Sequence, residues 1–363
     1  MIEGLERALE EWAPEGVREL LPALEAVLGG TGARGRLLAA QRLPRNRVRR
    51  LRVEQGDGVR GLIVKRFPPE RAQRERAAIE RWLPAVGLAA HGPPLLASIA
   101  DHSGRCTWFV YEDLGPCTLA EAASDPRRVC AATELLAELH ARFRDHALLG
   151  EVRCLGAELG TSFTATSARD ATRALATLSA QALPGPEARA LCARLLERLA
   201  QLRAELPART AALEAGGGPE TLVHGDAWTI NVLVRPAGSG FEARLIDWDH
   251  AGVGFASYDL STFLQRFPAR ARSGILAAYC ARYALRAPGP RWPSRAEWNA
   301  LFDTAERTRL AHTLMWRALA GLEGHLDWAL EELAAIEEAF ASLAPVLPAA
   351  AGAEGAPAPE GRA

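Results

Sequence analysis

The sequence has almost no lysine. Of its 43 lysine and arginine residues only Lys65 is a lysine. A codon bias towards arginine, alanine, glycine and proline would produce this pattern, and the 32 glycines and 23 prolines agree with such a bias. Alternatively, the lysine is retained at a site that needs a compact ammonium group on a flexible stem. Composition alone leaves both explanations open.

Other features that the sequence lacks argue against several classes of protein. The 43 basic residues nearly balance the 44 acidic ones, so no general electrostatic case exists for binding nucleic acid or an anionic membrane. No run approaches the roughly 18 uncharged apolar residues of a membrane span, and the acidic start has no signal-peptide pattern. The six cysteines form no Cys-x-x-Cys pair, which argues against a zinc site or a dense disulfide framework. We therefore expect a cytoplasmic protein that binds neither nucleic acid nor membrane.

The pattern of apolar residues divides the chain into four parts. Residues 1–30 have helical spacing. Residues 31–115 contain short apolar segments separated by turn residues, which predict a small antiparallel sheet with one helix. Residues 116–345 are mostly helical in pattern, apart from a strand-like stretch at 221–249. Residues 346–363 consist almost wholly of alanine, glycine, proline and glutamate, and we expect them to be disordered.

The strand-like stretch contains the most informative motif. His224-Gly-Asp226 is followed, after four further residues, by Asn231. This is the spacing of a kinase catalytic loop, in which the carboxylate orients an acceptor hydroxyl and takes its proton. The amide oxygen of Asn231 can turn back to bind magnesium, and Asp247 would bind the magnesium that bridges the nucleotide phosphates. The alternative is that His224 and Asp226 merely hold a loop and that Asp247 is a turn residue.

These motifs resemble the aminoglycoside phosphotransferase and choline kinase-like family, whose members are relatives of the protein kinases. The resemblance extends from about residue 30 to 344. It implies an α+β, protein-kinase-like fold of two lobes, with a small antiparallel-sheet N-lobe and a larger, mostly helical C-lobe. It also implies that Asp226 is the catalytic base, that Asn231 and Asp247 bind Mg²⁺ and that His224 braces the loop.

The same resemblance gives the single lysine a role. Lys65 follows the apolar residues 62–64, where kinase-like folds place the lysine that contacts the α- and β-phosphates. A glutamate from the next helix normally holds this lysine, and the resemblance favours Glu75. Glu75 and Glu80 lie roughly 140° apart on a helical wheel, so at most one of them should face the lysine. A solvated surface glutamate is the alternative for Glu75.

The loop expected over the nucleotide phosphates departs from the protein-kinase pattern. Residues 42–52 contain six arginines and no glycine, whereas protein kinases have Gly-x-Gly-x-x-Gly there. The phosphotransferase family often has a Ser-Asn or similar pair at this turn, and Asn46 fits that place. The arginines could clamp phosphate or bind RNA, but alternation along strands places many of them in solvent, which is the interpretation we favour. By resemblance, the connector at residues 111–114, with Glu112 and Leu114, binds the adenine or guanine base.

The residues that select the acceptor are harder to recognise. Acidic and tryptophan residues recur in the last helices, at Asp303, Glu306, Glu323, Asp327, Glu331, Trp316 and Trp328. An acidic, aromatic-lined pocket would suit a polycationic aminosugar, but solvent-exposed helix faces explain the same residues at least as well. We expect the acceptor to be a small molecule with a hydroxyl group, such as an aminoglycoside-type antibiotic, a sugar or an amino alcohol.

These observations favour an enzyme that moves the γ-phosphoryl group of ATP or GTP, with Mg²⁺, to a small-molecule hydroxyl by direct in-line transfer. One alternative is a non-catalytic pseudokinase that binds nucleotide. A protein kinase is a weaker alternative, because only about a dozen residues separate Asp247 from Asp259, too few for an activation segment. Asp259 matches the family's Asp-Leu pair that supports the catalytic loop, although a helix N-cap explains it equally well. The sequence is silent on oligomeric state.

Overall fold

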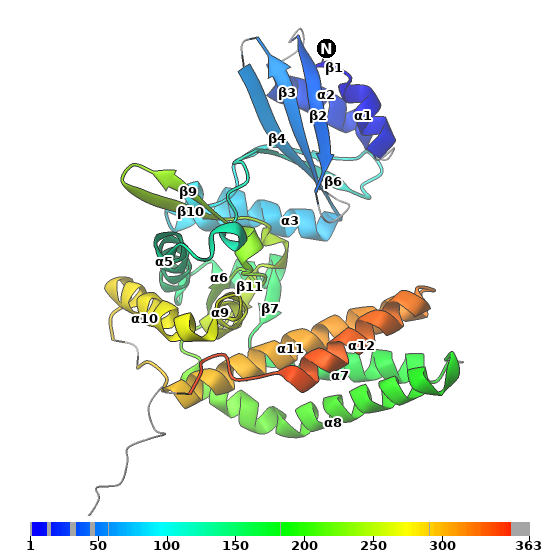
Figure 1. Cartoon of the computed structure of the whole chain (residues 1–363), viewed down its shortest axis with the longest axis vertical. Coiled ribbons are helices and arrows are strands. Elements are labelled where there is room, and N and C mark those ends of the chain that lie inside the picture. Colours follow the sequence, from blue (N-terminus) through cyan, green and yellow to red (C-terminus); the bar gives the residue numbers. More distant parts are fainter. Residues whose placement is uncertain are drawn as a thin grey trace, which may run out of the picture. The chain divides into compact units, whose positions relative to one another are not determined.

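The protein divides into two compact units (Figure 1). The computed structural model describes residues 2–12, 16–29, 34–43, 48–56, 58–181, 183–289 and 291–349. The first unit comprises Met1–Gly160, Pro219–Asp259 and Tyr279–Pro290. The second unit comprises Thr161–Gly218, Leu260–Ala278 and Arg291–Ala363. The part of the chain predicted to be a disordered tail lies, from residue 350 onward, outside the described residues.

A six-stranded sheet begins the first unit, with strand order β1-β2-β3-β4-β6-β5. The strands are β1 (Ile2–Glu3), β2 (Gly35–Arg42), β3 (Val48–Gln55), β4 (Gly58–Phe67), β5 (Leu95–Ala100) and β6 (Thr107–Glu112). The pair β1–β2 is parallel and the other pairs are antiparallel. Two-residue alternation gives β4 a fully buried face, with Leu62 and Val64, and a second face with Ile63 and Lys65.

Two short helices cover the buried face of this sheet. They are α1 (Leu5–Trp12) and α2 (Val17–Val27), drawn beside the strands in Figure 1. Their leucines recur at intervals of four residues, at Leu5 and Leu9 and at Leu20 and Leu24, so each helix presents one apolar stripe. These stripes pack against the apolar side chains of β3, β4 and β6 in one buried cluster. The residue 1–30 segment therefore contributes to the core of the sheet.

The helix after β4 is α3 (Pro69–Ala77), and it continues through a π-helical turn (Ala78–Trp82) into α4 (Leu83–Ala85). Pro69 at its start suits the first helical turn, where the missing N–H would have no partner. Ala72 of α3 packs with Phe67, Phe109 and Tyr111 in a second small cluster. This helix therefore lies on the sheet face that carries Lys65.

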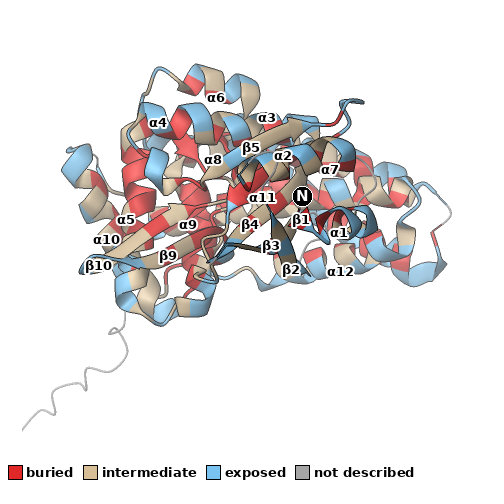
Figure 2. Ribbon diagram, turned by 90° about the horizontal axis from the view of Figure 1, so that it is seen from above, coloured by how far each residue is buried: buried red, intermediate tan, exposed pale blue. Residues whose placement is uncertain are grey.

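Helices and two small sheets complete the first unit. The helices are α5 (Pro126–Phe143), α6 (Leu149–Leu155), the beginning of α9 (Ala256–Gln265) and the end of α10 (Ala269–Arg286). The strands are β7 (Ala157–Leu159), β8 (Thr221–Val223), β9 (Val232–Ala237), β10 (Gly240–Leu245) and β11 (Gly252–Gly254). Strands β9 and β10 pair antiparallel, and β11 lies between β7 and β8. Much of α5 is buried, as Figure 2 shows, so it forms the centre on which these strands rest.

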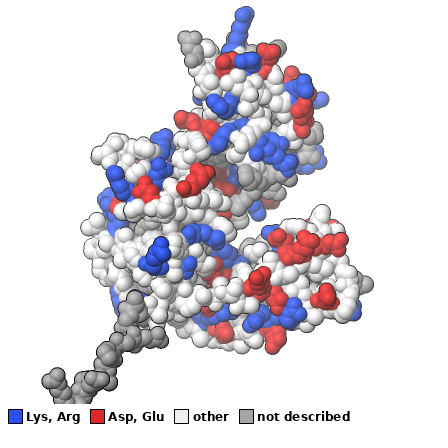
Figure 3. All heavy atoms as spheres, in the orientation of Figure 1, with Lys and Arg blue, Asp and Glu red and all other residues white. Residues whose placement is uncertain are grey.

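The second unit is helical. It contains α7 (Thr161–Ser179), α8 (Gly185–Gly216), most of α10 (Ala269–Arg286), α11 (Arg295–Leu322) and α12 (Leu326–Ser342). Leucine and alanine side chains of α7, α8, α11 and α12 form its core. A capping box of Ser294 and Glu297 begins α11. None of the described helices has the length and apolar character that a membrane crossing requires. Acidic and basic side chains are interspersed on the face seen in Figure 3, in keeping with the nearly balanced charge.

Candidate active site

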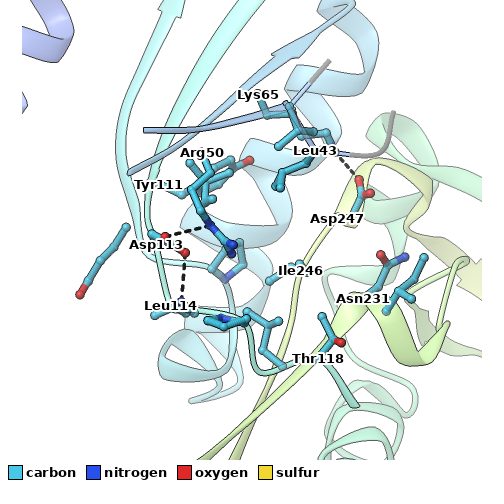
Figure 4. A pocket seen from close by; sticks show the side chains of 18 of the residues that line it. Leu43, Arg50, Lys65, Tyr111, Asp113, Leu114, Thr118, Asn231, Ile246 and Asp247 are labelled. Carbon is cyan, nitrogen blue, oxygen red and sulfur yellow. Dashed lines mark hydrogen bonds and ion pairs between the residues drawn. The ribbon is translucent and has the colours of Figure 1, made fainter. Parts of the chain in front are cut away.

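A cavity of about 600 Å³ lies within the first unit, between the sheet, the segment that follows β6 and the β9–β10 region (Figure 4). Its walls are mostly apolar on two sides, with Leu43, Val48 and Ile63 on the sheet side and Ile230, Leu233 and Ile246 opposite. Its charged and polar residues include Lys65, Glu75, Asn231 and Asp247. A mostly apolar space with a few polar groups is the usual form of a small-molecule site.

Strand register brings Lys65 into this cavity. Lys65 pairs with Val48 across β3–β4 and with Phe109 across β4–β6. Because Leu62 and Val64 face the core under α1 and α2, alternation turns Lys65 to the cavity side. The position of Lys65 on β4 therefore decides that its charged group lies on the cavity side of the sheet and not in the apolar core.

Lys65 forms an ion pair with Asp247. Its Nζ contacts Oδ1 of Asp247 and lies 4.1 Å from the centroid of the Phe67 ring. In Figure 4 the two side chains point toward one another, one from β4 and one from the segment after β10. Burial opposes the lysine charge, but the carboxylates of Asp247, Glu75 and Asp249 raise the pKa of Lys65 above its ordinary value. Burial also opposes the charge of Asp247, yet Lys65 holds the pKa of that carboxyl well below its usual range.

Glu75 is the glutamate of α3 that faces the cavity. Its side chain is buried, at 1% exposure, and its Oε1 accepts a hydrogen bond of 2.8 Å from the Tyr111 hydroxyl. Burial raises the pKa of Glu75 to about 7, and the nearby Lys65 limits the rise. Glu80 instead pairs with Arg76 at the surface, at 2.7 Å. Glu75 thus occupies the expected side of the helix, but the lysine is bound to Asp247.

The segment between β8 and β9 carries Asp226 and Asn231. The Asn231 Nδ2 donates to both the backbone oxygen and the Oδ2 of Asp226, each at 2.9 Å. This double contact fixes the Asp226 carboxylate and leaves the amide oxygen of Asn231 as its remaining polar atom. Asn231 lines the cavity, whereas Asp226 lies beyond the lining residues. The hydrogen bond between the two side chains therefore connects Asp226 to the wall of the cavity.

His224 braces this segment from inside. It is fully buried, its Nε2 lies 2.9 Å from the backbone oxygen of Ile246, and its Nδ1 accepts from the Asp226 N–H at 3.3 Å. The ring also packs on Trp248, with centroids 4.6 Å apart. One ring nitrogen therefore donates and the other accepts, which fixes the ring between the Asp226 segment and the end of β10.

Asp259 holds the same backbone from the other side. Its carboxylate accepts from the N–H groups of His224 at 2.7 Å and Gly225 at 2.9 Å, and its Oδ2 lies 3.2 Å from Nε2 of His140. Burial opposes its charge, but His140 and these donors lower the pKa of Asp259. Because Asp259 lies inside α9, which begins at Ala256, it is not the N-cap of a helix starting at residue 260.

His140 on α5 is a residue that the sequence analysis missed. It is fully buried, and its Nδ1 lies 2.9 Å from the Tyr279 hydroxyl. The sequence offers no spacing that would connect His140 with Asp259, which lies 119 residues away. Only the packing of α5 against β8 and α9 reveals that it belongs to the loop support.

Two arginines of α3 were also missed. Arg71 Nη1 contacts Oδ2 of Asp249 at 3.1 Å, and Arg74 Nη1 donates to the Asp249 backbone oxygen at 2.7 Å. Burial and the neighbouring Asp247 raise the pKa of Asp249. These contacts tie α3, and with it Glu75, to the turn that follows Asp247.

The segment after β6 lines the cavity with backbone and side-chain groups. Glu112 ends β6, and Leu114 follows in an irregular segment. The Asp113 N–H donates to the Gly61 oxygen at 3.1 Å. A side-chain carbon at position 61 would lie 2.8 Å from the Asp113 side chain, so glycine is required there for this close approach.

The arginines of residues 42–52 differ in their surroundings. Arg42 and Arg52 are exposed, as the strand alternation predicts. Arg50 lines the cavity and forms an ion pair with Asp113 at 3.0 Å, so the solvated-strand interpretation does not hold for it. Asp113 compensates the positive charge of Arg50, which strand alternation places on the cavity side of the sheet. Asn46, expected at the phosphate turn, lies outside the described residues.

Asn231 and Asp247 have the chemistry to hold a magnesium ion. Both residues line the same cavity, and Asp247, two residues after the end of β10, adopts a left-handed backbone with φ of 69°. Within the described part of the chain, no group of three or more His, Cys, Asp or Glu side chains could hold a metal. Magnesium needs few protein ligands because it keeps water and phosphate oxygens. The donor set therefore fits magnesium that arrives with a nucleotide.

The acidic residues considered for acceptor binding lie in the second unit. Asp303 pairs with Arg209 at 2.8 Å and Arg307 at 2.9 Å, and Glu306 pairs with Arg309 at 2.6 Å. The other acids, Glu323, Asp327 and Glu331, are exposed. Trp316 and Trp328 are 54% and 44% exposed. Arginine therefore neutralises Asp303 and Glu306, and a cationic acceptor stays a prediction.

Comparison with known proteins identifies the relatives of this chain. A sequence model of the phosphotransferase enzyme family matches residues 40–298. A comparison with curated proteins finds no match. A Plasmodium vivax ethanolamine kinase superposes with a TM-score of 0.54 at 11% identity, over 84% of this chain and 81% of that chain. A spectinomycin phosphotransferase solved with ADP and spectinomycin has a TM-score of 0.53 at 12% identity, over 89% and 98%.

A macrolide 2′-phosphotransferase from Brachybacterium faecium has a TM-score of 0.50 at 21% identity, over 87% of this chain and 97% of that chain. At such identities the likenesses establish the fold. They confirm the predicted α+β, kinase-like architecture with its N-terminal sheet and helical C-terminal part. Because the family match extends over well more than half of the sequence, the resemblance inferred from the Asp226 motif is also confirmed, and the chain belongs to the phosphotransferase enzyme family.

Proposed function

We propose that this phosphotransferase moves the γ-phosphoryl group of ATP or GTP to a hydroxyl group of a small molecule by direct in-line transfer. The observation that supports this function is the meeting of Lys65, Asn231 and Asp247 at one cavity, with Asp226 tied to Asn231 just beyond it. A nucleotide base fits the apolar part of the cavity, next to the backbone of Glu112 and Leu114. Its phosphates then extend toward Lys65.

Asp226 is the base of the proposed reaction. It accepts the proton of the acceptor hydroxyl as the new O–P bond forms and the bond between the β- and γ-phosphates breaks. The hydrogen bonds from Asn231 and the brace at His224 hold it in place. Lys65 binds the α- and β-phosphates. The chain thus contributes mainly positioning and charge stabilisation.

Asn231 and Asp247 hold magnesium in this proposal. When bound, the ion neutralises phosphate charge during transfer. Lys65 is paired with Asp247 in the structure, so nucleotide and cation together have to displace it from that carboxylate.

The relatives support a nucleotide and a hydroxyl acceptor but not a single substrate. One of them was solved with ADP and spectinomycin, one is an ethanolamine kinase and one modifies macrolides. We propose that this chain uses an acceptor of the same broad class, such as an amino alcohol, a sugar or an antibiotic. A cationic aminosugar is the narrower candidate, but the arginines beside Asp303 and Glu306 do not favour it.

The two alternative functions have less support. For a protein kinase, the stretch between Asp247 and Asp259 is too short, since it holds only a turn at 248–250, β11 and the start of α9. For a non-catalytic pseudokinase, the presence of Asp226, Asn231 and Lys65 is unexpected. A protein that bound nucleotide but never hydrolysed or transferred it would favour the pseudokinase.

The test combines Asp226→Ala with a matched surface variant, Asp327→Ala. We expect magnesium-dependent binding of ATP or GTP in both, but slow hydrolysis of the γ-phosphate to fall at least about a hundredfold in Asp226→Ala alone, the usual contribution of a general base. A screen of hydroxyl compounds for stimulated turnover would then identify the acceptor. Equal hydrolysis by Asp226→Ala and wild type would exclude Asp226 as the base.

A further inference from the structure

Glu75 has an unusual environment for a carboxylate. It is buried at 1% exposure, and its Oε1 accepts the hydroxyl of Tyr111 at 2.8 Å. Its Oε2 has no hydrogen-bond partner among the described residues. A buried polar atom without a partner costs stability, so such an atom at a functional cavity calls for an explanation.

The charged groups around Glu75 come from three neighbouring elements. Lys65 faces it from β4, Tyr111 from β6, and Asp247 and Asp249 from the segment after β10. Lys65 is bound to Asp247, and Arg71 of α3 is bound to Asp249. Among the hydrogen bonds of the described residues, the Tyr111 hydroxyl is therefore the group that holds the Glu75 carboxylate.

The proposed function requires this arrangement to change. Asp247 is the carboxylate expected to turn to magnesium, and Lys65 then loses its present partner. Oε2 of Glu75, a residue that lines the same cavity, has no hydrogen-bond partner among the described residues and can accept from the ammonium group. Oε2 can accept from Lys65 only if the Glu75 carboxylate keeps its orientation while the lysine side chain moves.

We propose that the Tyr111 hydroxyl is a positioning group that holds Glu75 so that its second oxygen is offered to Lys65 when a nucleotide engages Asp247. This inference rests on the proposed function. Tyr111 acts through Glu75 and makes no contact with the phosphates itself. Its hydroxyl therefore contributes to nucleotide affinity by fixing the position of the carboxylate that Lys65 binds after it leaves Asp247.

The tyrosine ring is held independently of its hydroxyl. It packs on Phe109, with centroids 5.9 Å apart, and belongs to the apolar cluster with Phe67 and Ala72. Because phenylalanine keeps the ring, Tyr111→Phe removes the hydrogen bond and little else. The buried Tyr283 of α10 offers a matched control for loss of a hydroxyl within the same unit.

The experiment is a double-mutant cycle on the full chain. Binding of ATP with MgCl₂ is measured by calorimetry for wild type, Tyr111→Phe, Glu75→Ala and the double variant, with Tyr283→Phe as control. We expect Tyr111→Phe to weaken binding about tenfold, the size of one hydrogen bond to a charged group. In the Glu75→Ala background the same change should have no further effect, because the hydroxyl then has nothing to position.

The outcomes separate the inference from the function on which it rests. If wild type binds ATP and Tyr111→Phe binds equally well, the positioning role is wrong and the proposed function stands. If Tyr111→Phe weakens binding by the same factor with and without Glu75, the hydroxyl acts directly on the nucleotide or through packing, and the inference is again wrong. If wild type binds neither ATP nor GTP with magnesium, the proposed function itself fails.

Discussion

Replacing Glu75 by glutamine removes the charge of a buried carboxylate while keeping the size of the side chain. In the folded protein the pKa of Glu75 is raised to about 7 because burial disfavours its charged form. Above that pH the wild type must hold the carboxylate ionised inside the protein, and the variant does not. We therefore expect Glu75→Gln to gain stability relative to wild type as the pH rises.

The sign and size follow from the two pKa values of Glu75. The folded protein has a pKa of about 7 and the unfolded chain the ordinary 4.5. Between these values the folded protein binds more protons, so the free energy of unfolding of the wild type falls as pH rises and levels off above pH 7. Integrated from pH 5 to pH 8, the loss is about 2 to 3 kcal/mol.

The assay is urea unfolding of both proteins at pH 5 and pH 8. The quantity of interest is the change in ΔΔG between the two pH values. Costs of the glutamine amide that do not depend on pH cancel in this difference. The exposed Glu338 on α12 supplies the control, since Glu338→Gln should behave alike at both pH values.

A pH-dependent change in ΔΔG below about 0.5 kcal/mol, the range of ordinary surface substitutions, would refute the reasoning. It would mean that Glu75 reaches water or a further partner in solution. The same variant should bind magnesium ATP more weakly, because a neutral amide is a poorer partner for Lys65. A variant that is more stable at pH 8 and less able to bind nucleotide would show that stability is given up at this position for function.

Two further predictions concern Lys65 and Gly225. Lys65→Arg keeps the charge and should stay folded by circular dichroism, yet lose most nucleotide hydrolysis. A planar guanidinium spreads its charge and does not reproduce the compact ammonium that lies between Asp247 and the Phe67 ring. Near-normal turnover would mean that codon bias alone explains the lone lysine. Gly225→Ala should lower both melting temperature and turnover, because the backbone has φ of +80° and the new carbon would lie 2.1 Å from the His250 oxygen. Gly218→Ala is the control, since its φ of +76° is similar and nothing lies within 4 Å; it should cost only about 1 kcal/mol, and equal effects of the two variants would contradict the steric argument.

The sequence alone supports a prediction where the residues concerned lie close together in the chain. The spacing of His224, Asp226 and Asn231 predicts a catalytic loop because a short loop can return an amide to a carboxylate five residues earlier. Lys65 was predicted from the resemblance to kinase-like folds, and the structure shows that alternation along β4 decides which face its side chain takes. Helical periodicity also limited the partner of Lys65 to one face of α3, and the structure turns the Glu75 face toward the cavity.

The sequence was not sufficient where a residue acts through a distant partner. Many of the arginines in residues 42–52 were expected in solvent, but Arg50 lines the cavity, where Asp113 compensates its charge. His140 carries no motif of its own and was missed, because its contact with Asp259 arises from helix packing. Nothing near Glu75 in the sequence points to Tyr111, 36 residues further along the chain.

By itself, then, the sequence determined the family of this phosphotransferase and predicted the chemical groups of its candidate site, since these follow from local motifs and their spacing. Only the tertiary structure decided how those groups are paired. Lys65 and Asp247 are 182 residues apart, and their contact requires β4 and the end of β10 to face the same cavity. Burial there removes water as a competing partner, so the surrounding protein decides which carboxylate holds the lysine and which is held by Tyr111.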